Sequence, residues 1–251
     1  MTAALRVEAL VRSFGGTRAV DGVSLTVDPG ACVALIGPNG SGKSTLLDIV
    51  TGYLAPEAGR VCIYGQDVTG RPPGHIACLG VSRTFQRVAV VPDLPVLENL
   101  LLMTAPDGRE TVRGALLPFA RIAASESEPL RRARSLLDRM DLSERASLLA
   151  RELSHGEQKL TALAGAVMRA PRLLLLDEPF AALSPVMIDR CADLVSLART
   201  QGAAIVFVEH NLDTVRSVCQ RVVVMARGRI IADGLPERVL DERAVLEEYL
   251  G

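Results

Sequence analysis

The 251-residue sequence contains no tryptophan, only eight aromatic side chains, and only two lysines, Lys43 and Lys159, beside 26 arginines. It also contains no apolar run that approaches the roughly 18 residues of a membrane-spanning helix, although 49% of its residues are apolar. No charge predominates, since 28 basic residues stand against 29 acidic ones and the formal net charge is −1. These absences exclude a chain that crosses a bilayer itself, and they argue against a nucleic-acid binder held by bulk charge.

The cysteines are few, odd in number and widely scattered. They form no CxxC pair, and no histidine lies beside them at the spacing of metal ligands. We therefore predict reduced thiols that pack as small hydrophobic side chains. Arg6 and Glu8 interrupt the N-terminus before an apolar stretch can begin, so we expect no secretory signal and a cytosolic location. The five cysteines are Cys32, Cys62, Cys78, Cys191 and Cys219.

Short alternating and continuous apolar segments predict an α/β fold. Residues 1–35 alternate apolar and polar side chains around Gly15-Gly16, which is typical of an antiparallel hairpin. Three continuous apolar runs, at 32–36, 173–176 and 204–208, predict buried strands of a parallel sheet that is covered on both faces.

The middle of the chain differs from its two ends. Helical spacing predominates from about residue 88 to 150, which predicts a helical subdomain. A last extended pair, Val222–Met225 and Arg229–Ala232, turns at Arg227-Gly228. The length allows one large α/β domain or two small ones.

A glycine-rich segment after the first apolar run matches the pattern G-x-x-x-x-G-K-[ST]. It follows a predicted strand and opens a predicted helix, which is the context that a phosphate-binding loop requires. Backbone N–H groups and the helix N-terminus would hold phosphate oxygens, while Lys43 contacts the β- and γ-phosphates and Ser44 a Mg²⁺ ion. Because lysine is so scarce here, its presence at this position favours a functional role over a surface lysine on a turn. The predicted nucleotide-binding residues are Gly37, Pro38, Asn39, Gly40, Ser41, Gly42, Lys43, Ser44 and Thr45.

Two carboxylates follow the buried run at 173–176. Asp177 would hold Mg²⁺ through water and Glu178 would polarise the attacking water, because the carboxyl end of a parallel strand faces the ligand. An acidic strand end that only solvates a turn is the alternative for this segment alone. No asparagine is followed by lysine, so the N-K-x-D segment of a GTPase is missing and guanine specificity is not expected.

A third segment identifies a family. Leu153-Ser154-His155-Gly156-Glu157-Gln158 precedes Asp177 by nineteen residues, and Glu209-His210 follows the third apolar run. With the phosphate loop and Asp177-Glu178, in this order, these segments resemble the ATP-binding subunits of ABC transporters over nearly the whole chain. The resemblance implies a P-loop NTPase with a parallel core sheet, an N-terminal antiparallel β subdomain and a helical subdomain at about 88–158. It also implies ATP and Mg²⁺ as ligands.

The resemblance assigns roles to further residues. In the family, two subunits close head to tail, so the signature segment Ser154, His155, Gly156, Glu157 and Gln158 would contact ATP bound to the other subunit. Gln86 would reach Mg²⁺ and the attacking water, and His210 would contact the γ-phosphate. Phe14 would stack on adenine, although a hairpin core residue is the alternative reading. His155 replaces the common glycine, as bulky residues do in the branched-chain amino acid branch, and Ser184 replaces the usual Asp or Asn.

Finer likeness favours one branch. The segments Arg83–Gln86, Pro95–Leu100, Phe207–Asn211 and Glu248–Gly251 resemble ATPases of high-affinity branched-chain amino acid importers. Implied partners are transmembrane permease subunits that dock near 87–102, a second identical or homologous ATP-binding subunit and, indirectly, a solute-binding protein, but no nucleic acid. The implied location is the cytoplasmic face of the cell membrane, peripheral through the permease.

Three alternatives stay open at this point. A urea or amide importer of the same branch would look similar, because the ATPase does not touch the solute. A soluble ABC ATPase of DNA repair or translation usually joins two cassettes or inserts a long coiled coil, and the sequence contains neither feature. A P-loop kinase explains the phosphate loop but not the signature segment together with Asp177-Glu178.

Overall fold

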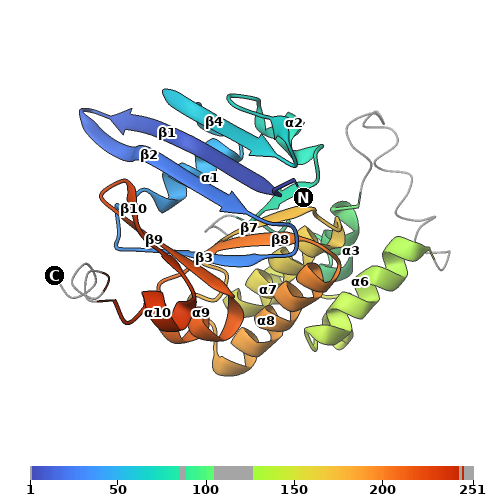
Figure 1. The fold of residues 1–251 in the computed structure, drawn as a ribbon. Coiled ribbons are helices and arrows are strands. Elements are labelled where there is room, and N and C mark those ends of the chain that lie inside the picture. Colours follow the sequence, from blue (N-terminus) through green and yellow to red (C-terminus); the bar gives the residue numbers. More distant parts are fainter. Residues whose placement is uncertain (1, 85–88, 105–126, 243–244, 246–251) are drawn as a thin grey trace. The chain divides into compact units, whose positions relative to one another are not determined.

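The computed structural model describes residues 2–84, 89–104, 127–242 and 245 (Figure 1). The chain forms two compact units. Unit 1 combines Met1–Arg83, Arg172–Ala181 and Arg199–Gly251, and unit 2 combines Thr84–Pro171 with Ala182–Ala198. Each unit is described by itself.

Unit 1 is built around a six-stranded sheet in the order β10-β9-β3-β8-β7-β6. Every neighbouring pair except β9 with β10 runs parallel. The predicted parallel core sheet is therefore confirmed. Its strands are β3 (Cys32–Ile36), β6 (Val81–Arg83), β7 (Leu173–Asp177), β8 (Ala204–Val208), β9 (Arg221–Ala226) and β10 (Arg229–Gly234).

The central strands of this sheet carry the continuous apolar runs seen in the sequence. All five residues of β3 and of β8 are buried, and so are the first four residues of β7. Strands buried on both faces need apolar side chains at every position, which is why they lack alternation. Because β3, β8 and β7 are adjacent and parallel, their carboxyl ends lie at one edge of the sheet.

A second, antiparallel sheet has the order β2-β1-β4-β5, with β1 at Leu5–Phe14, β2 at Thr17–Val27, β4 at Ala58–Ile63 and β5 at Gln66–Asp67. The predicted hairpin is confirmed, with Gly15 and Gly16 at its turn, where both have positive φ. Helix α1 (Lys43–Val50) contributes to one hydrophobic core together with residues of both sheets. The helix that follows the phosphate loop is thereby held by apolar contacts within a core that both sheets share.

The remaining elements of unit 1 are short. The predicted turn at Arg227-Gly228 joins β9 to β10, and both residues have positive φ, as a two-residue hairpin turn requires. The helices are α2 (Pro73–Ala77), α9 (Leu212–Val218) and α10 (Pro236–Val239).

Unit 2 is helical in its described part. Helix α6 buries Leu130, Ala133, Leu136 and Leu137 on one face, and its arginines occupy the other positions. Helix α3 contacts both α6 and α7. The elements are α3 (Val96–Leu102), α6 (Glu128–Arg139), the 3₁₀ turns η1 (Ser143–Arg145) and η2 (Ala150–Glu152), α7 (His155–Met168) and α8 (Pro185–Thr200), whose last two residues belong to unit 1. None of the helices in the described ranges is long and apolar enough to cross a membrane.

The cysteines provide a test of the fold. All five are free, and burial raises the pKa of Cys32 to about 12 and that of Cys219 to about 11. Because the thiolate is the reactive form, both thiols are protonated at pH 8 and should react with a thiol reagent only after unfolding. Cys78 is exposed and should react at once in the folded protein. Mass spectrometry identifies the modified cysteines. Rapid modification of Cys32 under native conditions would contradict its burial in the core.

Candidate nucleotide-binding site

The phosphate loop connects β3 to α1 and depends on glycine backbone conformations. Gly37, Gly40 and Gly42 all have positive φ, at 145°, 78° and 103°. A Cβ atom on Gly37 would lie 2.0 Å from the carbonyl oxygen of Met225, and one on Gly42 would lie 2.0 Å from that of Ala19. The loop therefore passes too close to neighbouring backbone for any side chain at these two positions.

Lys43, the first residue of α1, folds back into this loop. Its Nζ donates hydrogen bonds to the carbonyl oxygens of Gly37 at 2.8 Å and Pro38 at 2.9 Å, and to Ser41 Oγ at 3.3 Å. Burial lowers the pKa of Lys43, while the negative charges of Glu178 and Asp177 oppose this shift. The loop thus encloses a cation at the N-terminus of a helix, an arrangement that suits phosphate groups. Asn39, Gly40 and Ser44 of the same segment are exposed, and Pro38 and Thr45 are half-buried.

Asp177 ends β7, and an arginine holds it on one side. Arg83 Nη2 lies 3.7 Å from Asp177 Oδ2, while Nη1 donates to Asp48 Oδ1 at 2.7 Å and to Thr51 Oγ1 at 2.8 Å. Burial raises the pKa of Asp177, the charge of Arg83 lowers it, and the nearby Glu178 and Asp48 raise it further. Arg83 therefore links the end of β7 to helix α1.

Glu178 and His210 face each other across the ends of β7 and β8. His210 Nε2 lies 3.1 Å from Glu178 Oε1, and the two side chains are 38% and 24% exposed. Buried Glu209 supports both turns, because its Oε1 accepts the N–H of Phe180 at 2.8 Å and its Oε2 accepts the N–H of His210 at 3.1 Å. The sheet thus brings together the two side chains that the sequence assigns to the attacking water and the γ-phosphate.

Phe14 lies at the end of β1 and is 49% exposed. This exposure is incompatible with the alternative reading of a hairpin core residue. The guanidinium carbon of Arg12 lies 5.2 Å from the centre of the Phe14 ring, a distance within the range of a cation–π contact. The ring therefore offers an aromatic surface in unit 1, the unit that contains the phosphate loop.

The donor set in this unit suits magnesium. A hydroxyl at Ser44 and a carboxylate at Asp177 are hard oxygen ligands, which Mg²⁺ prefers, and phosphates and water usually complete its shell. Among the described residues no cluster of three or more His, Cys, Asp or Glu could hold a metal by protein side chains alone. Gln86, the other predicted ligand, lies with Phe85 outside the described residues.

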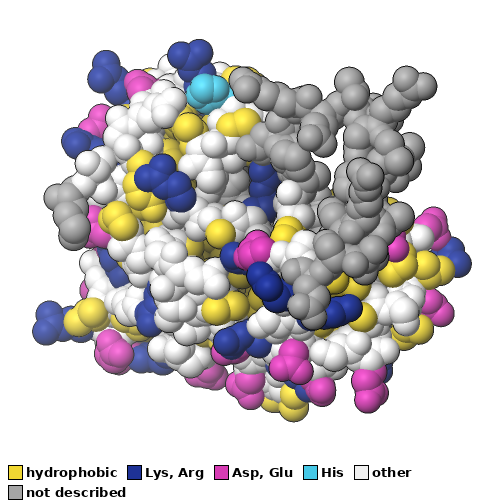
Figure 2. Space-filling model, turned by 90° about the vertical axis from the view of Figure 1, so that its right-hand side faces the viewer, with side chains coloured by type: hydrophobic (Ala, Val, Ile, Leu, Met, Phe, Trp, Pro, Cys, Tyr) yellow, Lys and Arg dark blue, Asp and Glu magenta, His cyan; other side chains and the backbone are white. Residues whose placement is uncertain are grey.

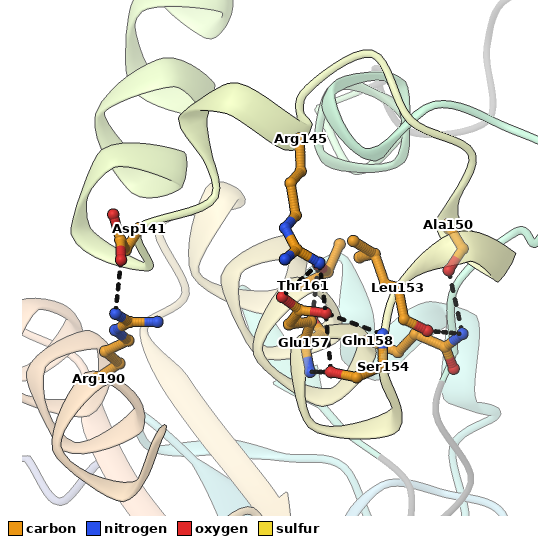
Figure 3. A network of polar contacts seen from close by, with 9 residues as sticks. All are labelled: Asp141, Arg145, Ala150, Leu153, Ser154, Glu157, Gln158, Thr161 and Arg190. Carbon is orange, nitrogen blue, oxygen red and sulfur yellow. Dashed lines mark hydrogen bonds and ion pairs between the residues drawn. The ribbon is translucent and has the colours of Figure 1, made fainter. Parts of the chain in front are cut away.

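The signature segment lies in unit 2 at the start of α7 (Figure 3). Ser154 is the N-cap: its Oγ accepts the N–H of Glu157, and the Glu157 carboxylate accepts the N–H of Ser154, a capping box. Gln158 Nε2 donates to the carbonyl oxygens of Ala150 and Leu153, which fixes the entry into the helix. A Cβ atom on Gly156 would lie 2.4 Å from Met187 Sδ, and His155 is exposed.

The structure adds residues that sequence reasoning missed. In the sequence, Arg83 and Glu209 stand out only as parts of matching segments, and Asp48 does not stand out at all. The contacts of Glu209 with Phe180 and of Arg83 with Asp48 and Asp177 join residues 29, 35 and 94 positions apart in the chain, so no local spacing could have indicated them. Asn99, in unit 2, is another residue whose contacts the sequence does not reveal. It is buried, its Oδ1 accepts the N–H of Val91 at 2.7 Å, and its Nδ2 donates to the carbonyl oxygens of Val91, Leu94 and Pro95 at 3.1 Å.

Comparison with known proteins shows the family of the chain. The ABC transporter family matches residues 20–181. The high-affinity branched-chain amino acid transport ATP-binding protein BraF of Pseudomonas aeruginosa is 35% identical over 98% of this chain and 97% of its own length. LivG of Escherichia coli, with the same description, is 34% identical over 98% and 97%. The crystal structure of the ADP conformation of MJ1267, an ATP-binding cassette of an ABC transporter, is 35% identical, covers 100% of both chains and has a TM-score of 0.84.

The fold and the phosphate loop define a P-loop ATPase, and the matches show to which family of P-loop ATPases it belongs. The chain belongs to the ABC transporter family, among the ATP-hydrolysing subunits.

Substitution of Gly42 tests the loop. We expect G42A to weaken ATP binding by at least about 100-fold, because its Cβ would meet the Ala19 carbonyl and displace Lys43. The matched control is G40A: its φ is also positive, but a Cβ there meets nothing within 4 Å. G40A should lose about 1–2 kcal/mol of stability from backbone strain alone. Equal ATP affinities of the two variants by calorimetry would contradict the close approach at Gly42.

Proposed function

We propose that the chain is the ATP-hydrolysing subunit of an importer for branched-chain, hydrophobic amino acids. The observation that carries the proposal is the juxtaposition, at one sheet edge, of the Lys43 loop, Asp177 and the Glu178–His210 pair. The names of BraF and LivG support the choice of solute. Residues 1–251 would form one ABC-type domain, with the helical subdomain of about 88–158 inside unit 2.

The phosphate loop would bind ATP by exchanging its internal contacts for contacts with the nucleotide. Lys43 would leave the Gly37 and Pro38 carbonyls for the β- and γ-phosphates, and the N–H groups of residues 39–45 would surround them. The exposed ring of Phe14 would stack on adenine, supported by Arg12.

Hydrolysis would proceed at the ends of β7 and β8. Glu178 would accept a hydrogen bond from the attacking water and polarise it, and His210, released from Glu178, would contact the γ-phosphate. Ser44, Gln86 and Asp177 would hold the metal site, with Asp177 positioned by Arg83. A bound Mg²⁺ ion would neutralise charge on the β- and γ-phosphates.

The second half of the site would come from another subunit, identical or homologous. Ser154 and the N–H groups that open α7 would contact the γ-phosphate of ATP on the facing copy, since a helix N-terminus that carries a hydroxyl suits an anion. His155, Gly156, Glu157 and Gln158 would complete that surface. ATP would then join two subunits, and hydrolysis would release them.

Permease subunits would receive the resulting motion through unit 2. Val91 and Leu102 expose 40% and 36% of their surface, and buried Asn99, which lies between them in the sequence, forms hydrogen bonds with Val91, Leu94 and Pro95. Exposed apolar side chains in this segment would suit contact with a membrane protein. Residues 87 and 88 of the expected contact lie outside the described residues.

The formal net charge of −1 argues against a nucleic-acid partner held by bulk charge. Both basic and acidic side chains of the described residues are visible on the face in Figure 2. The chain would therefore reach the cytoplasmic face of the membrane only through its permease, and a solute-binding protein would act on the permease from the other side.

Exchange of Glu178 tests the hydrolytic role. E178Q should lower ATP turnover by about 10²–10⁴-fold and leave ATP affinity within about threefold, because the amide cannot act as a base but keeps the shape of the side chain. The control is E237Q, an exposed carboxylate on α10, which should leave both values unchanged. Steady-state hydrolysis and ATP titration measure the two quantities. Wild-type turnover in E178Q would remove Glu178 from this role.

Cell fractionation tests the transporter assignment. The chain should be recovered with membranes only when permease subunits are co-expressed, and radiolabelled leucine uptake into such cells should disappear with E178Q. Uptake of urea or a short amide instead would favour the related importer. Sedimentation with ribosomes or nucleic acid in place of membranes would favour a soluble ABC ATPase.

A further inference from the structure

The carboxylate of Glu157 is the centre of a polar network at the start of α7 (Figure 3). Glu157 is buried, and its Oε2 accepts the N–H of Ser154 and the hydroxyl of Ser154, each at 2.8 Å. These contacts explain the capping box. They also occupy the Ser154 hydroxyl, which donates its hydrogen to a carboxylate of its own helix.

An arginine from a different element completes the network. Arg145, at the end of η1, places its Nη1 2.8 Å from Glu157 Oε1 and 3.1 Å from Oε2. In Figure 3 its side chain extends from η1 toward the carboxylate of Glu157. The Arg145 side chain is 48% exposed and that of Glu157 only 10%, so a half-exposed cation covers a buried anion.

This pairing matters if a phosphate approaches the same helix end, which is what the proposed function requires. A buried carboxylate in the first turn would repel that phosphate and cancel the attraction of the helix N-terminus. Arg145 supplies the opposite charge at the same place. The Glu157 oxygen that accepts the Ser154 hydroxyl also accepts Arg145, so the carboxylate keeps a strong donor when the hydroxyl turns away.

We propose that Arg145 is a positioning residue of the signature segment: it neutralises Glu157 and thereby allows Ser154 to donate its hydroxyl to the γ-phosphate bound by the facing subunit. The inference rests on the proposed function and extends it to a residue outside the signature segment. Arg145 acts through Glu157, so its effect must depend on the charge at position 157.

A double-mutant cycle tests this dependence. In the full-length chain carrying E178Q, the ATP concentration for half-maximal association of subunits is measured by light scattering for the parent, R145A, E157Q and R145A/E157Q. R145A should raise that concentration about tenfold or more, because Glu157 is then a buried, unpaired charge. With E157Q already present, loss of Arg145 should change it less than about threefold. R145K should retain most of the association.

Two controls separate charge compensation from loss of folding. R190A breaks the other arginine–carboxylate pair in Figure 3, Arg190 Nη2 to Asp141 Oδ2 at 2.7 Å, which does not involve Ser154 or Glu157. It should leave ATP-driven association unchanged. ATP affinity of the separated subunit, measured at low protein concentration, should be the same in R145A and in the parent, because the signature segment contacts the nucleotide of the other copy.

The outcomes are distinct. An equal effect of R145A with and without E157Q, or none at all, overturns the role of Arg145 while S154A still impairs association and the proposed function stands. If S154A is also without effect, or if the parent never associates with itself or with the second ATPase subunit of its transporter at saturating Mg·ATP, the pairing itself falls and this inference falls with it.

Discussion

The enclosed ammonium group of Lys43 is the interaction on which the site depends. A buried cation is tolerated only where oxygen atoms surround it, and here the carbonyls of Gly37 and Pro38 provide them. Those carbonyls converge only because the loop adopts backbone angles that glycine alone accepts next to Met225 and Ala19. The glycine positions, the backbone angles of the loop and the placement of the Lys43 charge therefore depend on one another.

The parallel sheet imposes the second constraint, because it gathers the ends of β3, β8 and β7. The turn after β7 carries strain: Glu178 has a φ of 49°, which costs a non-glycine residue on the order of 1 kcal/mol. Glu209 offsets this cost by accepting N–H groups from both the β7 and the β8 turns. Buried Glu209 therefore supports the turn that carries the half-buried Glu178, the carboxylate that would contact water.

The sequence was most informative where function is local. The apolar runs predicted β3, β7 and β8, and the glycine spacing predicted the phosphate loop, because each follows from neighbouring residues. Arg83 could not be predicted in the same way, since its partners Asp48 and Asp177 are distant in the chain and become neighbours only in the folded sheet. Arg145 is similar: twelve positions separate it from Glu157, and the segment between them, which contains the 3₁₀ turn η2, is not one regular helix. Ser154 and Glu157, in contrast, are three positions apart and match the sequence pattern of a capping box, so their contact follows from a four-residue segment.

The division of groups between the two units has a consequence for the cycle. The lysine loop, Asp177, Glu178 and His210 belong to unit 1, whereas the signature segment belongs to unit 2. Within each unit these groups bond to neighbouring residues: Lys43 to loop carbonyls, His210 to Glu178, and Ser154 to Glu157. Under the proposed pairing, ATP must replace all three internal contacts, so the net gain on closure is small compared with the sum of the new bonds. Loss of the γ-phosphate then removes the partner of His210 and Ser154 together, and the internal contacts can form again.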